Sequence, residues 1–225
     1  MKNYYSESLH SLRLQKCYDI APHRVQQYLD AEIRFVADKI KPDDSVLELG
    51  CGYGRVIHRL SEKAGMITGI DISEENILYA KKLCSAAGNC QFYTMNAIDL
   101  DFDDSTFDVV FCIQNGLSAF KVEPKLLVRE ALRVTKKSGI ALFSSYSHKF
   151  WGHRIEWFRI QAQHGLIGTI DHAQTGNGVI VCKDGFKATT FSAADFLKLT
   201  AKFDVETSIC EVDDSSIFCE MTLKH

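Results

Sequence analysis

Three glycines at alternate positions form the part of the sequence best suited to bind a ligand. Gly50, Gly52 and Gly54 follow a short apolar run at residues 45–49, and helical spacing of apolar residues resumes directly after them. Glycines at a strand-to-helix turn let backbone N–H groups approach a ligand without interference from Cβ atoms. The pattern predicts a nucleotide-like ligand, and a turn that serves only tight packing of strand against helix is the alternative.

The residues around this turn exclude two common kinds of nucleotide site. Arg55 stands where the nicotinamide fingerprint Gly-x-Gly-x-x-Gly needs its third glycine, which disfavours a dinucleotide-dependent oxidoreductase. A phosphate-binding P-loop needs Gly-Lys-Ser/Thr after the glycines, and this is absent. Asp71, 21 residues after Gly50 at the end of a second predicted strand, can accept two hydrogen bonds from a ribose diol. A purely structural acid is the alternative for Asp71.

The elements that must position these residues alternate between strand and helix. Five apolar runs are predicted to be buried strands, and helical segments separate them: 45–49, 66–70, 90–95, 107–113 and 140–145. Nearly continuous apolar strands that alternate with helices are typical of a parallel sheet covered on both faces. The predicted fold class is α/β.

The pattern changes after Ser145. We expect an aromatic-rich helix over 150–164, a hairpin around 183–185, a helix capped by Ser192, and adjacent strands at 205–212 and 216–223. The expected organisation is a single domain over 1–225 with an inserted cap region at 146–190.

The start of the chain is predicted to form a lid segment, residues 1–23. A helix that is merely docked on the core is the alternative for this segment. Its apolar and aromatic residues are Tyr4, Tyr5, Leu9, Leu12, Leu14 and Tyr18.

Composition indicates a cytoplasmic protein that binds neither nucleic acid nor a membrane. The formal net charge is −3, whereas nucleic-acid and anionic-membrane binders usually carry a basic excess. No apolar run approaches the ~20 residues that span a bilayer, and the N-terminus lacks the apolar core of a signal peptide. The eight cysteines form no Cys-x-x-Cys pair and resemble small buried hydrophobes. No metal site is expected, because the acidic loop at 99–104 looks like a solvated connection.

Four motifs in order resemble those of the class I S-adenosylmethionine-dependent methyltransferases, of the type that act on small molecules. The resemblance covers roughly residues 24–145 and, more loosely, the final helix and two strands. The motifs are Val46-Leu47-Glu48-Leu49-Gly50-Cys51-Gly52-Tyr53-Gly54, Gly69-Ile70-Asp71-Ile72-Ser73, Phe107-Asp108-Val109-Val110-Phe111, and the stretch from Leu126 to Gly139.

The resemblance implies a Rossmann-like, doubly wound sheet of seven strands, mostly parallel, with an antiparallel last strand. It implies S-adenosyl-L-methionine as the cofactor. The cofactor-binding residues that it implies are Arg24, Glu48, Gly50, Cys51, Gly52, Tyr53, Asp71, Ile72, Asn96, Ala97, Ile98 and Gln114.

The resemblance also implies separate roles for these residues. Glu48 would organise the loop or meet the methionine ammonium, and Asp71 would hold both ribose hydroxyls. Ile72 would pack on the adenine, Asn96 would contact its amino group, and Gln114 would lie near the methyl group. Arg24 stands where some members place a cation for the cofactor carboxylate, and a plain surface arginine is the alternative.

The sulfonium already activates the methyl group, so the protein has to align the acceptor and exclude water. A general base is needed only for an acceptor that is protonated at the working pH, and no catalytic residue stands out. The aromatic run from Trp151 to Phe158 is expected to form cap core, with a wall around the substrate as the alternative. Candidates for a base are His148, His153, His172, Tyr4 and Tyr5.

Residues 114–117, Gln-Asn-Gly-Leu, lack the Asn/Asp-Pro-Pro-Tyr/Phe motif typical of enzymes that methylate nucleobases or planar amides. The sequence therefore predicts methyl transfer to a small-molecule acceptor. The alternative is a cofactor-binding module or regulatory protein without catalysis. The acceptor, its reacting atom (O, N, S or C) and the oligomeric state are not predicted.

Overall fold

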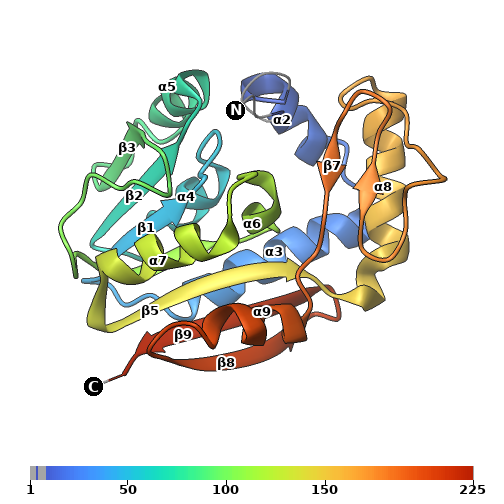
Figure 1. Ribbon diagram of the computed structural model, residues 1–225. Helices are drawn as coiled ribbons and strands as arrows, with labels where there is room; N and C mark the ends of the chain where they lie inside the picture. Colours follow the sequence, from blue (N-terminus) through green and yellow to red (C-terminus); the bar gives the residue numbers. More distant parts are fainter. Residues whose placement is uncertain (1–3, 5–8, 225) are drawn as a thin grey trace.

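The computed structural model describes residues 4 and 9–224, so the Tyr5 candidate lies outside the described residues. A seven-stranded sheet in the order β3-β2-β1-β4-β5-β9-β8 runs through the molecule (Figure 1). Strand β9 pairs antiparallel with both β5 and β8, while the other neighbours pair parallel. The strands are β1 Ser45–Leu49, β2 Met66–Asp71, β3 Cys90–Thr94, β4 Phe107–Cys112, β5 Thr135–Tyr146, β8 Val205–Val212 and β9 Ser216–Leu223.

This topology confirms the predicted α/β class with an antiparallel last strand. Strand β9 lies inside the sheet, however, because β8 pairs along its outer edge. The direction of connection reverses between β1 and β4, which are neighbours in the sheet. In open α/β folds such a reversal opens a crevice at the carboxyl ends of the strands, where ligands bind.

Helices cover both faces of the sheet, and several begin at residues that favour a helix start, among them the expected cap Ser192. Ser73 accepts a hydrogen bond from the Asn76 nitrogen, Pro124 occupies the first turn of its helix, and Ser192 forms a capping box with Asp195. The helices are α2 Ser11–Asp19, α3 His23–Ala37, α4 Arg55–Leu60, α5 Glu74–Leu83, α6 Gly116–Ala119, α7 Pro124–Val134, α8 Trp151–Gln163 and α9 Ala193–Thr200.

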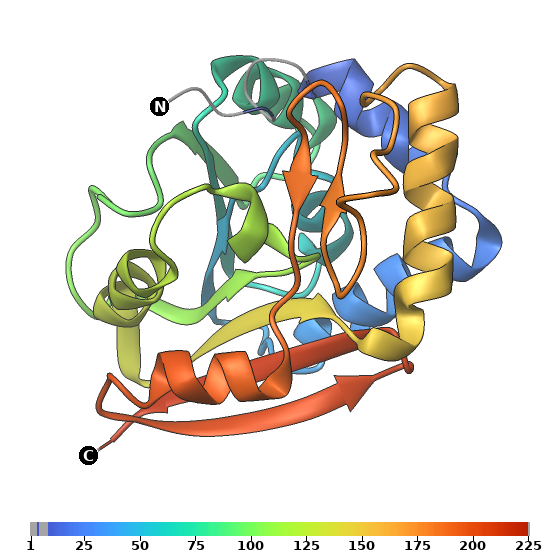
Figure 2. The ribbon, with the colours of Figure 1, turned by 45° about the vertical axis from the view of Figure 1, so that its right-hand side comes forward.

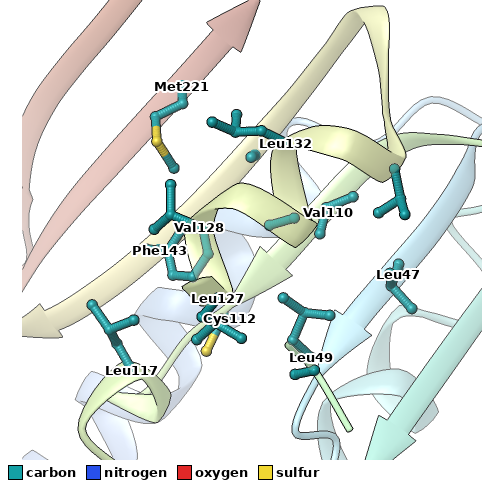
Figure 3. Close-up of a cluster of buried hydrophobic side chains, with 14 of the residues drawn as sticks. Leu47, Leu49, Val110, Cys112, Leu117, Leu127, Val128, Leu132, Phe143 and Met221 are labelled. Atoms are coloured by element: carbon teal, nitrogen blue, oxygen red, sulfur yellow. The ribbon is translucent and has the colours of Figure 1, made fainter. Parts of the chain in front are cut away.

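Each face of the sheet has its own apolar core. On one face, Val110 and Phe143 of the strands pack against Leu127 and Val128 of α7 (Figure 3). Helices α3, α4 and α5 bury their apolar residues against the opposite face. Burial on both faces explains the uninterrupted apolar character of the central strands.

A third cluster joins the start of the chain to the 146–190 region. It contains Tyr28 of α3, Trp157 of α8 and Phe186, which lies in the hairpin formed by β6 (Ile180–Val181) and β7 (Lys187–Ala188). The Trp157 indole nitrogen donates to the Cys17 carbonyl at 2.9 Å. Figure 2 shows α8, the hairpin and α2 at the same end of the molecule. These distant segments therefore form one packed cover.

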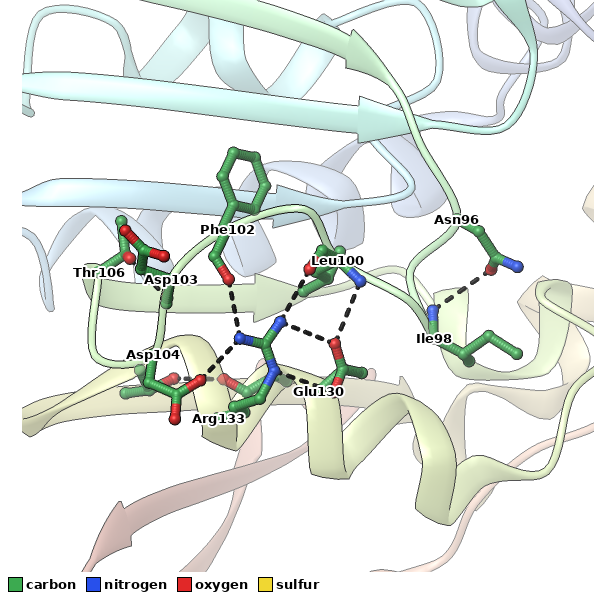
Figure 4. Close-up of polar contacts among 11 residues, drawn as sticks. Asn96, Ile98, Leu100, Phe102, Asp103, Asp104, Thr106, Glu130 and Arg133 are labelled. Carbon is green, nitrogen blue, oxygen red and sulfur yellow. Dashed lines mark hydrogen bonds and ion pairs between the residues drawn. The ribbon is translucent and has the colours of Figure 1, made fainter.

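The acidic loop between β3 and β4 is organised by a single arginine (Figure 4). Arg133 of α7 donates to the carbonyls of Leu100 and Phe102 at 2.9 and 2.8 Å. It also forms ion pairs with Asp104 and Glu130, at 2.8 and 2.9 Å. The loop is thus more than a solvated connection, because its backbone is tied to α7.

All eight cysteines are free, and six of them are buried. Over the described stretch of chain, none of the helices combines the length and the apolar character that crossing a membrane requires. Within the same residues, no group of three or more histidine, cysteine or acidic side chains is placed to hold a metal ion.

Candidate active site

The glycine turn lies at the carboxyl end of β1, directly before α4. Gly50, Gly52 and Gly54 have φ angles of +74°, +52° and +84°, a region that side-chain-bearing residues rarely adopt. A Cβ on Gly50 would lie 2.9 Å from the Phe120 ring, and one on Gly52 would lie 3.0 Å from Leu14. Glycine is therefore required both by the backbone conformation and by the close approach of neighbouring side chains.

Asp71 closes one side of this turn. Its carboxylate accepts hydrogen bonds from the Gly52 nitrogen at 3.0 Å, the Ser73 nitrogen at 2.8 Å and the Asn76 amide at 3.2 Å. Burial raises the pKa of Asp71, and these three donors oppose that shift. Two carboxylate oxygens offer about four acceptor positions, so capacity remains for a ligand hydroxyl.

Glu48 and Gln114 bring further polar atoms to the same place. Glu48, near the end of β1, is 5% exposed, and its Oε2 has no hydrogen-bond partner among the described residues. Burial raises the pKa of Glu48 to about 8, although the nearby Arg55 lowers it in part. The Gln114 Nε2, just after β4, is likewise buried without a partner in the described chain. Orphaned buried groups of this kind are rare in folded proteins, and here two of them belong to residues at the same place, the ends of β1 and β4.

Gln114 owes its position to a carboxylate on α3. Its backbone nitrogen donates to the Glu32 Oε2 at 2.6 Å and to the Ser144 hydroxyl at 2.8 Å. Glu32 is fully buried, which raises its pKa to about 7. Nothing in the sequence distinguished Glu32, because its role depends on β4 and β5 packing beside α3.

A cavity extends from these groups to the cover formed by α2, α8 and the hairpin. From the cover, Tyr18, Trp157, Phe158 and Phe186 present aromatic surface to it, and Tyr146 adds its ring from the end of β5. The site therefore has a polar floor at the strand ends and an apolar wall opposite.

Two further polar side chains line the cavity. The Arg55 guanidinium lies over the Tyr18 ring at 4.3 Å and donates to the Gln114 Oε1 at 2.6 Å. Gln161 of α8, which is 3% exposed, also lines the cavity. Neither was expected as a site residue. The sequence carries no signal for Gln161, while Arg55 served only to exclude a dinucleotide site.

The structure brings most of the expected cofactor residues together. The eight that line the cavity are Glu48, Gly50, Cys51, Gly52, Tyr53, Asp71, Ile72 and Gln114.

The other four expected residues do not line the cavity. Arg24 pairs with Asp213 at 2.7 Å and lies over the Phe150 ring. The Asn96 Oδ1 accepts a hydrogen bond from the Ile98 nitrogen, and Ala97 is buried. Their contacts with the cofactor stay predictions.

The candidate bases are also away from the cavity wall, as far as the chain is described. His148, His153 and His172 are exposed and do not line it. Tyr4 donates its hydroxyl to the Asp184 carboxylate at 2.6 Å. Burial and the contact with Asp184 raise the pKa of Tyr4.

Known proteins share this fold and motif region. Residues 46–139 match the family model described as a methyltransferase domain. The 2-methyl-6-phytyl-1,4-hydroquinone methyltransferase of Synechocystis sp. is 28% identical over 137 residues, which are 57% of this chain and 42% of that protein. The 24-methylenesterol C-methyltransferase 3 of Arabidopsis thaliana is 32% identical over 112 residues, or 48% of this chain and 30% of that protein.

The match spans less than half the length of both curated relatives. A solved S-adenosylmethionine-dependent methyltransferase from Methanosarcina mazei has the same fold, with a TM-score of 0.64 and 21% identity over 85% of this chain and 98% of that chain. The predicted resemblance is confirmed at this level: residues 46–139 match a methyltransferase domain, and the fold is that of solved S-adenosylmethionine-dependent methyltransferases.

Proposed function

We propose that this protein transfers the methyl group of S-adenosylmethionine to a small-molecule acceptor held between the glycine turn and the cover. One observation carries the proposal. Three of the buried polar atoms without a hydrogen-bond partner in the described chain, Glu48 Oε2, Gln114 Nε2 and Arg55 Nε, belong to residues that line one cavity. A ligand that satisfies them would occupy the crevice at the carboxyl ends of β1 and β4.

The residues at the floor fit the cofactor. The Glu48 carboxylate would accept from the methionine ammonium, and Asp71 would accept from both ribose hydroxyls. Glycines at 50 and 52 leave room where a Cβ would meet Phe120 or Leu14. Ile72, which is 42% exposed beside Asp71, would pack on the adenine.

The cofactor supplies a methyl group activated by its sulfonium. This chain would hold the acceptor in line with the methyl carbon and sulfur and would keep water out, which is worth ~7–11 kcal/mol of the barrier. We propose that the chain is a single domain in which two covering segments exclude water. These segments are the N-terminal lid at 1–23 and the cap at 146–190. The contact between Trp157 and Cys17 supports their acting together.

The acceptor side of the cavity is mainly aromatic, which favours an apolar ring-bearing molecule. The two curated relatives are named for a phytylated hydroquinone and a sterol, both molecules of that kind. The net charge of −3 disfavours nucleic acid, and we propose a cytoplasmic small-molecule enzyme. The aromatic wall beyond the cofactor residues speaks against a module that only binds the cofactor.

Thermal unfolding with S-adenosylmethionine, S-adenosylhomocysteine and NADH tests the cofactor assignment. A ligand at 100 times its dissociation constant adds ~2.7 kcal/mol, which raises Tm by roughly 5–10 °C for a domain of this size. We expect both sulfur nucleosides to stabilise the protein and NADH to have no effect. Asp71→Ala should abolish the shift, whereas Asp101→Ala in the exposed part of the acidic loop should retain it.

Transfer of tritiated methyl groups from S-adenosylmethionine to small molecules of a cell extract tests catalysis. We expect labelled, organic-extractable product with the wild type and none with Asp71→Ala. Cofactor binding without any labelled product, at several pH values, would contradict the enzyme and favour the non-catalytic alternative.

A further inference from the structure

Arg55 places a positive charge in the cavity near Glu48, whose pKa it lowers, but no carboxylate of the described residues hydrogen-bonds to its guanidinium. Its Nη2 donates to the neutral Gln114 amide, and its guanidinium stacks on the Tyr18 ring. Its Nε is buried with no hydrogen-bond partner, and Arg55 forms no ion pair with the described residues. A half-buried guanidinium usually has an anionic partner, because it offers five donors in a fixed fork. Arg55 thus keeps a buried donor that an anionic ligand could satisfy.

The position of Arg55 points toward the acceptor. It begins α4 beside the glycine turn, while Tyr18, on which it stacks, packs against Trp157 of α8 with 6.1 Å between ring centroids. Arg55 therefore lies between the polar floor and the aromatic wall. An anion bound by it would belong to a molecule that extends along that wall.

The titratable groups of the cavity favour an acceptor that is already ionised when it binds. No histidine or lysine lies among the described lining residues, so none is at hand to take a proton from a neutral acceptor. The thiol of Cys17 and the phenol of Tyr146 are protonated at neutral pH, since burial raises the pKa of each to about 12. Glu48 and Asp71 belong to the floor.

Gln161 places an uncharged amide group on the aromatic wall of the cavity. The residue is 3% exposed, lines the cavity, and its side-chain amide has no hydrogen bond to any described residue. Trp157 and Phe158, four and three residues earlier on α8, flank it with apolar surface. If a planar molecule packed on this wall, the Gln161 amide could form a hydrogen bond with a second polar atom of that molecule.

We propose that the acceptor is an apolar, ring-bearing molecule with an oxygen group that is anionic at neutral pH, and that Arg55 binds this anion while Gln161 binds a second polar atom. The inference rests on the proposed function and adds the charge of the acceptor. A carboxylate and an acidic phenol or enol share this chemistry, and a carboxylate is the simpler probe.

The test compares carboxylates with their neutral amides of the same shape. Binding of benzoate and 2-naphthoate, and of benzamide and 2-naphthamide, is measured by calorimetry with and without S-adenosylhomocysteine. We expect at least one carboxylate to bind tenfold or more tightly than its amide. Arg55→Gln should remove that preference while changing S-adenosylhomocysteine affinity less than threefold, and Arg55→Lys should keep part of the preference.

Arg59→Gln is the matched control, because Arg59 lies one turn further along α4 and pairs with Asp30 at the surface. It should behave as wild type. Equal affinity for acid and amide, or no binding of either carboxylate, would overturn the proposal. So would a tenfold loss of S-adenosylhomocysteine affinity in Arg55→Gln with the acid preference intact, which would assign Arg55 to the cofactor. Failure of S-adenosylhomocysteine to bind the wild type would count against the proposed function instead, and the cofactor-free titrations would still decide the role of Arg55.

Discussion

The carboxylate of Glu32 on α3 holds the backbone of Gln114, a residue 82 positions later in the chain, at 2.6 Å. Gln114 has a φ angle of +57°, which is uncommon for a residue with a side chain. The same Glu32 oxygen accepts from the Ser144 hydroxyl at 2.9 Å. One buried carboxylate thus stabilises the conformation in which Gln114 borders the cavity.

The buried Glu32 carboxyl makes stability depend on pH. Burial raises its pKa from 4.5 to about 7, so between these values the folded protein keeps a proton that the unfolded chain has lost. The stability this group contributes is complete below about pH 4.5 and is lost as pH rises through 7, at up to roughly 1.4 kcal/mol per pH unit. In urea unfolding from pH 5 to 8 without cofactor, Glu32→Gln should show a shallower decline than the wild type. Parallel curves for the two proteins would contradict this.

Glu48 should release a proton when the cofactor binds. Burial holds its pKa near 8, so much of the free protein carries a neutral Glu48 at pH 7. A ligand ammonium beside it favours the ionised form, and binding should release up to about one proton. Calorimetry of S-adenosylhomocysteine in phosphate and Tris buffers measures this number. Glu48→Gln should release none from this position and bind about tenfold or more weakly, whereas an equal proton count in both proteins would exclude Glu48.

Gly54 should not tolerate alanine. Its φ is +84°, and a Cβ there would lie 2.9 Å from the Ala80 Cβ and 3.2 Å from the Ala80 Cα. Gly54→Ala combines backbone strain with overpacking against α5 and should cost roughly 2–4 kcal/mol. Gly88→Ala is the control, since nothing lies within 4 Å of its added Cβ. Urea denaturation should show a loss only at position 54, and equal stability of both variants would refute the account.

Arg133 should contribute more to the stability of the protein than Arg129, which lies on the same helix. Arg133→Gln removes hydrogen bonds to two loop carbonyls and two ion pairs, and we expect a cost of roughly 1–3 kcal/mol. Arg129→Gln, at an exposed position of α7, should be nearly neutral. Hydrogen exchange should also accelerate at residues 99–106 in the first variant alone. Unchanged exchange there would show that the loop does not depend on Arg133.

The sequence predicted the fold well where local signals coincide with burial. The expected strands 205–212 and 216–223 match β8 and β9 in both bounds, because apolar runs flank a short Asp-Asp-Ser turn. Strand β5 is longer than expected and begins at Thr135. Its first residues, Thr-Lys-Lys-Ser-Gly, are polar, and only pairing of Thr135 with Phe107 of β4 makes them strand.

The candidate site could be predicted only in part. The residues of the glycine turn and Asp71 lie within a few positions of the carboxyl ends of their strands. Because these ends lie at the same edge of a parallel sheet, the proximity of these residues could be predicted. The family resemblance placed Arg24 near the cofactor carboxylate, which stays a prediction; in the structure Arg24 pairs with Asp213 in the turn between β8 and β9. Gln161 and Glu32 depend on how α8 and α3 pack, which no spacing in the sequence encodes.

The outer position of β8 also bears on self-association. Strand β8 pairs only with β9 in the described sheet, so its other side is a free edge on which a second copy could add a strand. If two β8 strands paired antiparallel over their full length, Glu206 of each copy would lie opposite Glu211 of the other, whose carboxylate already pairs with Lys149 at 2.6 Å. Glu206 is exposed and forms no ion pair with the described residues, so its charge is the one that opposes edge-to-edge aggregation at the end of the sheet farthest from β3.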